Sequence, residues 1–161
     1  MVFYLPDLRR DNIALYTIPA FWAISIYPRI FALKLFEAET SEKFDTRVPR
    51  DFQGKVAANT KLDESKRGRI RRAEAACANG FENFGLFAAA VTAGSFAGLD
   101  PLTLNGLTLG YLVSRIFYNR YYIAAETAGI AKVRTAAYMG GLALLFTIFI
   151  KAAQKLNKLN A

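Results

Sequence analysis

Long apolar stretches and one long polar stretch alternate along this chain. Four stretches are nearly free of acidic and basic side chains. A helix rises about 1.5 Å per residue, so helices formed by these stretches and their polar flanks approach the roughly 30 Å thickness of the hydrocarbon core of a bilayer. The pattern predicts an all-α integral membrane protein, a four-helix bundle in one domain over residues 1–161. The predicted spans are about residues 12–36, 71–98, 102–126 and 132–154. A soluble helical bundle is the alternative, but its helices would carry a charged outer stripe, which these stretches lack.

The polar stretch covers residues 37–70, which we expect to form a loop or a surface helix hairpin. Ten of the 21 Lys and Arg residues lie in it or just after it. A second basic group, Arg120, Lys132 and Arg134, lies around the connection between the third and fourth spans. Basic residues favour the cytoplasmic side, so we expect both groups in the cytoplasm and both termini across the membrane. The net charge of +8 fits attraction to lipid headgroups, and without a nucleic-acid-binding motif we expect no nucleic-acid partner.

The second span carries Asn79 and Glu82, three positions apart in an otherwise apolar run. At this spacing they share a helix face, which Arg72 extends two turns back. A charged side chain at the bilayer centre costs about 2.5 to over 10 kcal/mol. We therefore expect Glu82 to face protein or water and to have partners.

The third span becomes polar towards its end. Arg115, Tyr118, Tyr122 and Glu126 recur at a spacing that places them on one helix face. Arg115 lies several residues inside the span, so we expect Glu82 to be its counter-ion. Such a pair would either only hold the helices together, with the tyrosines as an interfacial belt, or belong to a binding pocket.

The fourth span opens with Arg134 and Tyr138 and continues with Gly140 and Gly141, which permit close helix approach. Arg134 is either an anchor at the cytoplasmic boundary or part of a cationic, tyrosine-lined recess. A recess of this kind would bind a small anionic molecule. The bilayer would deliver a lipophilic molecule to the same place.

The first span contains Arg29, directly after Pro28. We expect its side chain either to reach the cytoplasmic headgroups or to point into the bundle as an anion ligand. No small-residue cleavage site follows the span, so we expect it to remain in the mature protein. The chain has no His, which excludes a histidine base; we expect no metal site, and we expect the single cysteine, Cys77, to be a buried filler.

Three segments in combination resemble the MAPEG family, the membrane-associated proteins of eicosanoid and glutathione metabolism. They are NGFENFGLF at 79–87, RIFYNRYYIA at 115–124 and RTAAYMGG at 134–141. Microsomal glutathione transferases, leukotriene C synthase and microsomal prostaglandin E synthase belong to this family. The resemblance covers about residues 71–145 and is closest to the microbial branch.

The resemblance implies a left-handed bundle that assembles as a homotrimer, with glutathione between neighbouring subunits near the cytoplasmic face. It implies catalytic roles for Arg134, Tyr118 and Glu82, with Arg134 beside the thiol, where a positive charge stabilises the thiolate. The thiolate would attack a lipophilic substrate entering from membrane lipid. The implied glutathione-binding residues are Arg72, Asn79, Glu82, Arg115, Tyr118, Tyr122, Arg134 and Tyr138. The implied location is the endoplasmic reticulum of a eukaryote or the inner membrane of a bacterium.

Two positions depart from the family pattern. Ala75 stands where several members have an arginine, and Gly85 stands where they have a proline. One glutathione contact is therefore missing or supplied by Arg72. Three functions follow: a glutathione-dependent transferase, peroxidase or isomerase; a glutathione-independent isomerase or cyclase with Glu82, Tyr118 or Tyr122 as acid or base; and a non-catalytic lipid-presenting scaffold, which Ala75 favours.

Overall fold

The computed structural model describes residues 7–159, which fold into helices with no β-strand among them. The all-α class is therefore confirmed. In chain order the elements are η1 (Ala14–Tyr16), α1 (Thr17–Thr40), η2 (Pro49–Asp51), α2 (Phe52–Ala58), α3 (Glu64–Glu82), α4 (Phe84–Phe96), α5 (Pro101–Ala124) and α6 (Ala128–Leu159), where η marks a short 3-10 helix.

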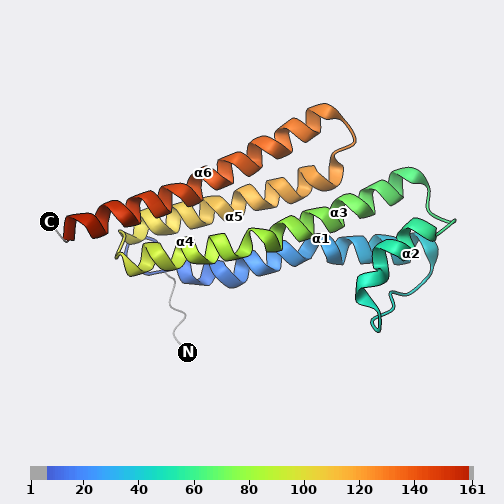
Figure 1. Ribbon diagram of the computed structural model, residues 1–161, viewed down its shortest axis with the longest axis horizontal. Coiled ribbons are helices and arrows are strands. Elements are labelled where there is room, and N and C mark those ends of the chain that lie inside the picture. The colour runs from blue at the N-terminus through green and yellow to red at the C-terminus, as the bar shows by residue number, and fades with distance from the viewer. Residues whose placement is uncertain (1–6, 160–161) are drawn as a thin grey trace.

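The long helices lie side by side as rods: α1, α3 continued by α4, α5, and α6 (Figure 1). α1 packs mainly on α3, and α6 packs on α5 and α4. The start of α1 and the end of α6 lie at one end of the molecule, and α2 lies at the other end with the α5–α6 connection (Figure 1). Residues 41–63 and 125–127 therefore share one end, which we call the polar end.

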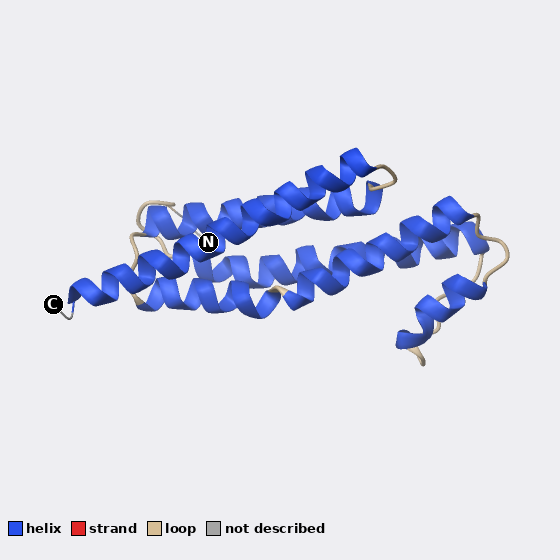
Figure 2. Cartoon of the chain, turned by 45° about the horizontal axis from the view of Figure 1, so that its top comes forward, coloured by secondary structure: helices blue, strands red, loops and turns tan. Residues whose placement is uncertain are grey.

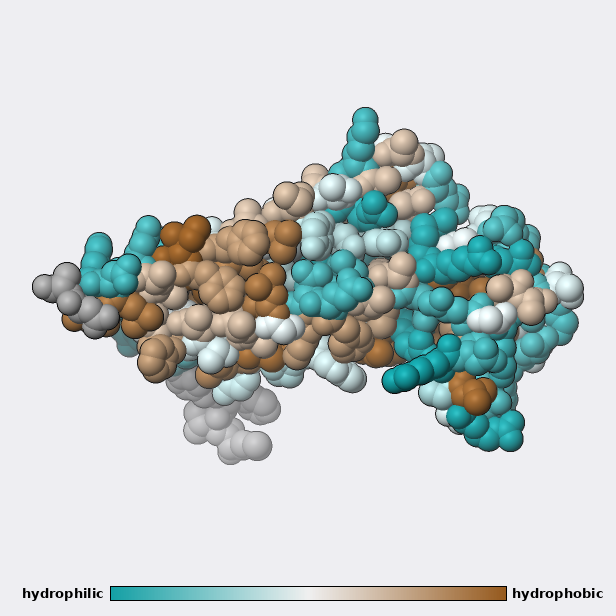
Figure 3. Space-filling model, viewed as in Figure 1, coloured by the Kyte–Doolittle hydropathy of each residue, from teal (hydrophilic) through white to brown (hydrophobic). Residues whose placement is uncertain are grey.

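Two helical stretches are long and apolar enough to cross a membrane, Ala14–Thr40 and Ala128–Leu159. They coincide with the first and fourth predicted spans. Figure 3 shows hydrophobic residues gathered over the body of the rods and hydrophilic residues gathered over the polar end. The helices of the second and third predicted spans, α3, α4 and α5, do not reach the same length and apolar composition. These two spans stay predictions.

The second predicted span is interrupted, because α3 ends at Glu82 and α4 begins at Phe84 (Figure 2). Between them, Asn83 Nδ2 donates a hydrogen bond to the main-chain oxygen of Asn79 at 2.9 Å. A side chain that binds the carbonyl four residues earlier competes with the helix ladder and bends the helix. The interruption therefore follows directly after the polar pair of this span.

The polar segment is shorter than predicted and holds a helix of its own. α1 continues to Thr40 and α3 begins at Glu64. Between them, α2 is held to the rods by the buried side chains of Phe52 and Val56, and the Phe52 ring lies 5.4 Å from the ring of Phe36 at 78°. This end of the molecule is therefore a small apolar core beneath a charged surface.

Candidate functional site

Six predicted site residues form a continuous chain of contacts across α3, α5 and α6. We call them the arginine–tyrosine cluster: Asn79, Arg115, Tyr118, Tyr122, Arg134 and Tyr138. One-turn spacing on α5 brings Tyr118 and Tyr122 together, and the same spacing on α6 places Arg134 and Tyr138 on one face. The packing of α6 on α5 then joins the two faces.

Arg115 is the buried centre of the cluster, with 2% of its surface exposed. One guanidinium nitrogen donates to Asn79 Oδ1 at 2.8 Å, and the guanidinium carbon lies 4.2 Å from the centre of the Tyr118 ring. Its Nε has no hydrogen-bond partner among residues 7–159, and no carboxylate in that range forms an ion pair with it. The charge is therefore balanced only by an amide oxygen and by aromatic faces.

Arg134 stands at the other end of the cluster. Its guanidinium carbon lies 4.6 Å from the centre of the Tyr122 ring, and that ring lies 5.4 Å from the Tyr118 ring at 69°. Tyr138 closes the group, with its ring 5.7 Å from that of Tyr118. Tyr122, Arg134 and Tyr138 are half-buried, whereas Tyr118 is buried. A ligand can therefore reach the cluster from the Tyr122 and Arg134 side.

Asn79 is held in one orientation. Its Oδ1 accepts hydrogen bonds from Arg115 at 2.8 Å and from Asn83 Nδ2 at 3.4 Å. Both partners are donors, so the side-chain oxygen is fixed towards them and the amide nitrogen is directed away. Because Asn79 is half-buried, this nitrogen is a donor available to a ligand.

The predicted Arg115–Glu82 ion pair is wrong within one chain. Arg115 bonds Asn79 instead, and Glu82, at the last position of α3, is exposed and forms no ion pair with any residue in 7–159. Three residues of an α-helix turn through about 300°, so Glu82 points about 60° away from the direction of Asn79. Asn79 faces α5, and Glu82 faces outward.

Arg72 and Glu126 also lie outside the cluster, where they hold the polar end together. Arg72 donates from Nε to the main-chain oxygen of Ile123 at 3.1 Å and forms an ion pair with Glu126 Oε1 at 3.1 Å. Glu126 is not on the predicted helix face, because α5 ends at Ala124 and the chain turns towards α6. Within the chain, Arg72 is engaged by Glu126 and by the end of α5.

Arg29 points towards α3 and the polar segment, where it binds a carboxylate of the same chain. It forms an ion pair with Glu74 at 2.6 Å and donates to the main-chain oxygen of Pro49 at 2.9 Å. Its guanidinium carbon lies 5.7 Å from the centre of the Phe44 ring and 5.9 Å from that of Phe52. Arg29 therefore ties α1 to α3 and to the polar segment.

Sequence reasoning missed two buried asparagines that anchor backbone. Asn105 accepts from the main-chain nitrogen of Ala14 at 2.9 Å and donates to the main-chain oxygens of Leu8 and Asp11 at 2.9 and 2.8 Å. Asn119 donates to the main-chain oxygen of Ile24 at 2.9 Å. For Asn105 the available signal was its isolation in an apolar stretch, because a polar amide there requires a partner. Asn119 stands between Tyr118 and Arg120 and gave no such signal.

A hollow of about 740 Å³ lies apart from the cluster, between α1 and the opposite side of α5. Ile24, Tyr27, Ile116 and Ile123 contribute to its walls, and no cluster residue lines it. The cluster is therefore packed within the chain rather than spread around this hollow, and its half-buried edge faces outward.

Comparison with known proteins places the chain in a family. No curated protein and no solved structure matches the chain significantly. A family profile described as MAPEG family, whose members include glutathione transferases and related enzymes, matches residues 17–154. This range starts with α1 and holds the whole arginine–tyrosine cluster and most of α6, and with its two apolar helices the chain is a membrane protein that belongs to the MAPEG family.

Proposed function

We propose that this protein is a membrane-embedded glutathione-dependent enzyme, a transferase, peroxidase or isomerase, that acts on a lipophilic electrophile. One observation carries the proposal: two arginines flank a tyrosine cluster, and the inner one, Arg115, has no carboxylate partner among the described residues. A buried cation without a counter-ion is costly, and an anionic ligand near it lowers that cost. Glutathione, with two carboxylates and an ionisable thiol, has suitable chemistry.

The proposed roles of the cluster residues follow from how far each side chain is exposed. Arg115 is buried and acts as a positioning residue that holds Asn79 and Tyr118. Asn79 Nδ2 donates to a carboxylate or carbonyl oxygen of the ligand. The hydroxyl of Tyr122 and the guanidinium of Arg134 lie at the accessible edge and stabilise negative charge at sulfur.

When bound, glutathione supplies the thiol that ionises and becomes the nucleophile. Arg134 carries a fixed positive charge, which favours thiolate over thiol. With an aryl halide, the carbon–sulfur bond forms as the carbon–halogen bond breaks, and the halide leaves with the bonding electron pair. The lipophilic reactant would reach the accessible edge of the cluster from the bilayer.

The proposal includes a left-handed bundle in a homotrimer with its site at the subunit boundary, near the cytoplasm. One feature of the single chain supports this assembly. Glu82 is an exposed carboxylate within a predicted span, and hydrocarbon would not tolerate it. A neighbouring subunit would cover it, and the glutathione ammonium is a suitable partner for it. A detergent-solubilised protein mass of three times 17.9 kDa checks this assembly.

Conjugation of glutathione to a generic aryl halide tests the proposed activity. We expect Arg134→Gln to lower kcat/KM roughly tenfold to hundredfold near pH 7, because it removes the charge beside the thiolate. At saturating glutathione, kcat/KM for the aryl halide rises with pH in the wild type as the bound thiol ionises. In the variant this rise moves to higher pH, towards the ordinary thiol pKa of about 8.5.

Lys132→Gln is the matched control, because Lys132 is exposed, also basic, and only two residues away on α6. It leaves the pH profile unchanged. Equal activity of Arg134→Gln and wild type would contradict the role of Arg134. Glutathione-independent turnover of a lipophilic substrate would favour an isomerase or cyclase, and lipid binding without any turnover would favour a scaffold.

A further inference from the structure

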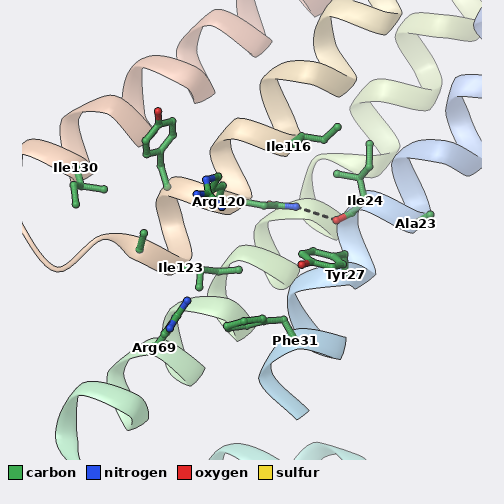
Figure 4. A pocket seen from close by; sticks show the side chains of 12 residues that line it. Ala23, Ile24, Tyr27, Phe31, Arg69, Ile116, Arg120, Ile123 and Ile130 are labelled. Carbon is green, nitrogen blue, oxygen red and sulfur yellow. Dashed lines mark hydrogen bonds between the residues drawn. The ribbon is translucent and has the colours of Figure 1, made fainter. Parts of the chain in front are cut away.

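The 740 Å³ hollow between α1 and α5 is a groove with an apolar wall. Tyr27 and Phe31 of α1 face Ile123 of α5, and Ile116 extends the wall away from the polar end (Figure 4). From Ile116 to Ala124 the wall runs for about 12 Å along α5. Its α1 side belongs to a helix long and apolar enough to cross a membrane. The groove is therefore open to molecules that dissolve in the bilayer.

The charged residues that line this groove are both arginines. Arg69 reaches it from α3 and Arg120 from α5 (Figure 4). Both are exposed, and neither forms an ion pair with a carboxylate in residues 7–159. The Arg69 guanidinium carbon lies 5.2 Å from the centre of the Phe31 ring, so this cation also borders the apolar wall.

The nearest carboxylates are already paired with other cations. Glu39 and Glu126 line an adjoining hollow of about 410 Å³ together with Arg69. Lys66 Nζ lies 2.5 Å from Glu39 Oε2, and Arg72 lies 3.1 Å from Glu126 Oε1. The positive charge of Arg69 and Arg120 is therefore left for a ligand.

We infer that this groove binds one anionic phospholipid of the surrounding bilayer, with its phosphate on Arg69 and Arg120 and an acyl chain along the Tyr27, Phe31, Ile116 and Ile123 wall. Arg69 lies one turn inside the start of α3, at the polar end, whereas Ile116 lies deeper along α5. This order of cation and apolar wall matches the order of headgroup and chain in a lipid. Basic pockets between membrane helices recognise anionic headgroups in the same way.

The site is separate from the arginine–tyrosine cluster and does not depend on the proposed enzyme activity. α5 turns about 100° per residue, so Arg120 and Ile123 are directed away from Arg115 and Tyr118. A water-soluble anion would leave the apolar wall unused. A second copy of this basic chain, with net charge +8, would bring further cations towards the two arginines.

Native mass spectrometry of the detergent-solubilised protein tests the inference, with phosphatidylglycerol and phosphatidylcholine of identical acyl chains as probes. We expect the wild type to bind phosphatidylglycerol roughly tenfold tighter or more, and Arg69→Ala/Arg120→Ala to lose this preference. Ala23→Trp, which fills the groove from an exposed position on α1, weakens binding of both lipids.

The matched control is Arg71→Ala/Lys132→Ala, which removes two exposed charges that do not line the groove and keeps the preference. Circular dichroism melting of each variant confirms that it is folded. Equal affinity of the wild type for both lipids would overturn the inference, as would loss of the preference in the control or unchanged binding in Ala23→Trp. Displacement of the lipid by soluble glycerol phosphate would show that the site binds a phosphate headgroup without an acyl chain. This result would also overturn the inference.

Discussion

Two arginines inside this fold are stabilised in different ways. Arg29 has a carboxylate partner, Glu74, of which 7% is exposed, whereas Arg115 relies on Asn79 and on aromatic rings. The charge of an arginine in an ion pair is already neutralised by its carboxylate, so a further anion binds to it weakly. A buried arginine without such a partner attracts an anion. The difference separates a structural arginine from one that supports a binding site.

We predict that Glu74→Ala destabilises the protein strongly, by about 3–5 kcal/mol, because it leaves the Arg29 cation partly buried without its partner. The double variant Arg29→Met/Glu74→Leu should recover most of this loss, since it removes both charges. Thermal unfolding in detergent, followed by circular dichroism, measures both effects. A double variant no more stable than Glu74→Ala would show that the charge pair is not what Glu74 contributes.

At this scale, sequence spacing predicted the residues that meet along one helix face and failed for partners that lie far apart in the chain. Arg115, Tyr118 and Tyr122 were predictable because one-turn spacing is local. Glu74 was not, because its partner Arg29 lies 45 positions away and no periodicity connects them. The direction of Glu82 depended on how α3 is rotated against α5, which a single helix pattern does not determine.

Close contact between elements depends on small residues at defined points. A Cβ at Gly80 of α3 would lie 2.8 Å from Ser25 Cβ and 3.1 Å from Ser25 Cα on α1, whereas a Cβ at Gly85 of α4 would meet nothing within 4 Å. The same difference holds on α6, where Gly141 lies against Ser114 and Gly140 is free. The predicted close helix approach therefore applies to Gly141 but not to Gly140.

We predict that Gly80→Ala destabilises the protein by about 1–3 kcal/mol, because a backbone atom blocks the new methyl group and α1 must move. Gly85→Ala is the matched control and should be neutral or stabilising by up to about 1 kcal/mol, since alanine favours a helix. Thermal unfolding of both variants in the same detergent decides the point. Equal midpoints would contradict the proposed contact between α1 and α3.

The start of α3 gives the protein a pH dependence at its polar end. Asp63 caps this helix by accepting from the main-chain nitrogen of Lys66 at 2.8 Å, and this hydrogen bond lowers the pKa of Asp63 below its ordinary value. The ionised cap therefore stabilises the folded protein at a pH above the pKa of Asp63 in the unfolded chain, about 3.9. This stabilisation is lost as the pH falls through the lower pKa of Asp63 in the folded protein.

We therefore predict that the wild type loses more stability than Asp63→Asn when the pH is lowered from about 5 to 3. Asparagine also caps helices but does not titrate, so this variant keeps the hydrogen bond and removes the pH dependence. Melting curves across this pH range test the prediction. Parallel curves for the two proteins would mean that the Asp63 cap does not contribute.

The helical class of the elements was predictable, but their number and their ends were not. Asn83 lies at the interruption of the second span. Its side chain and its main-chain nitrogen share the carbonyl of Asn79, a local contact that hydrophobic periodicity does not predict. The end of α5 at Ala124, before Glu126, removed that residue from its predicted face. The sequence left a loop and a surface helix hairpin open for the polar segment, because the few apolar residues that dock α2 are scattered among charges.

In the molecule as a whole, two proposed sites lie on different sides of α5. The arginine–tyrosine cluster faces α3 and α6 and is the proposed glutathione site, while the groove beside α1 is the inferred lipid site. In the proposed assembly, a neighbouring subunit would contact two surfaces: the half-buried edge of the cluster at Tyr122 and Arg134, and the exposed Glu82.

Isothermal titration of glutathione into the detergent-solubilised protein is the decisive test of the proposed glutathione site. We predict saturable binding to the wild type, at least roughly tenfold weaker binding to Asn79→Leu, which loses the donor held in place by Arg115, and unchanged binding to Lys132→Gln. The absence of saturable binding to a folded wild-type protein would contradict the proposed glutathione site.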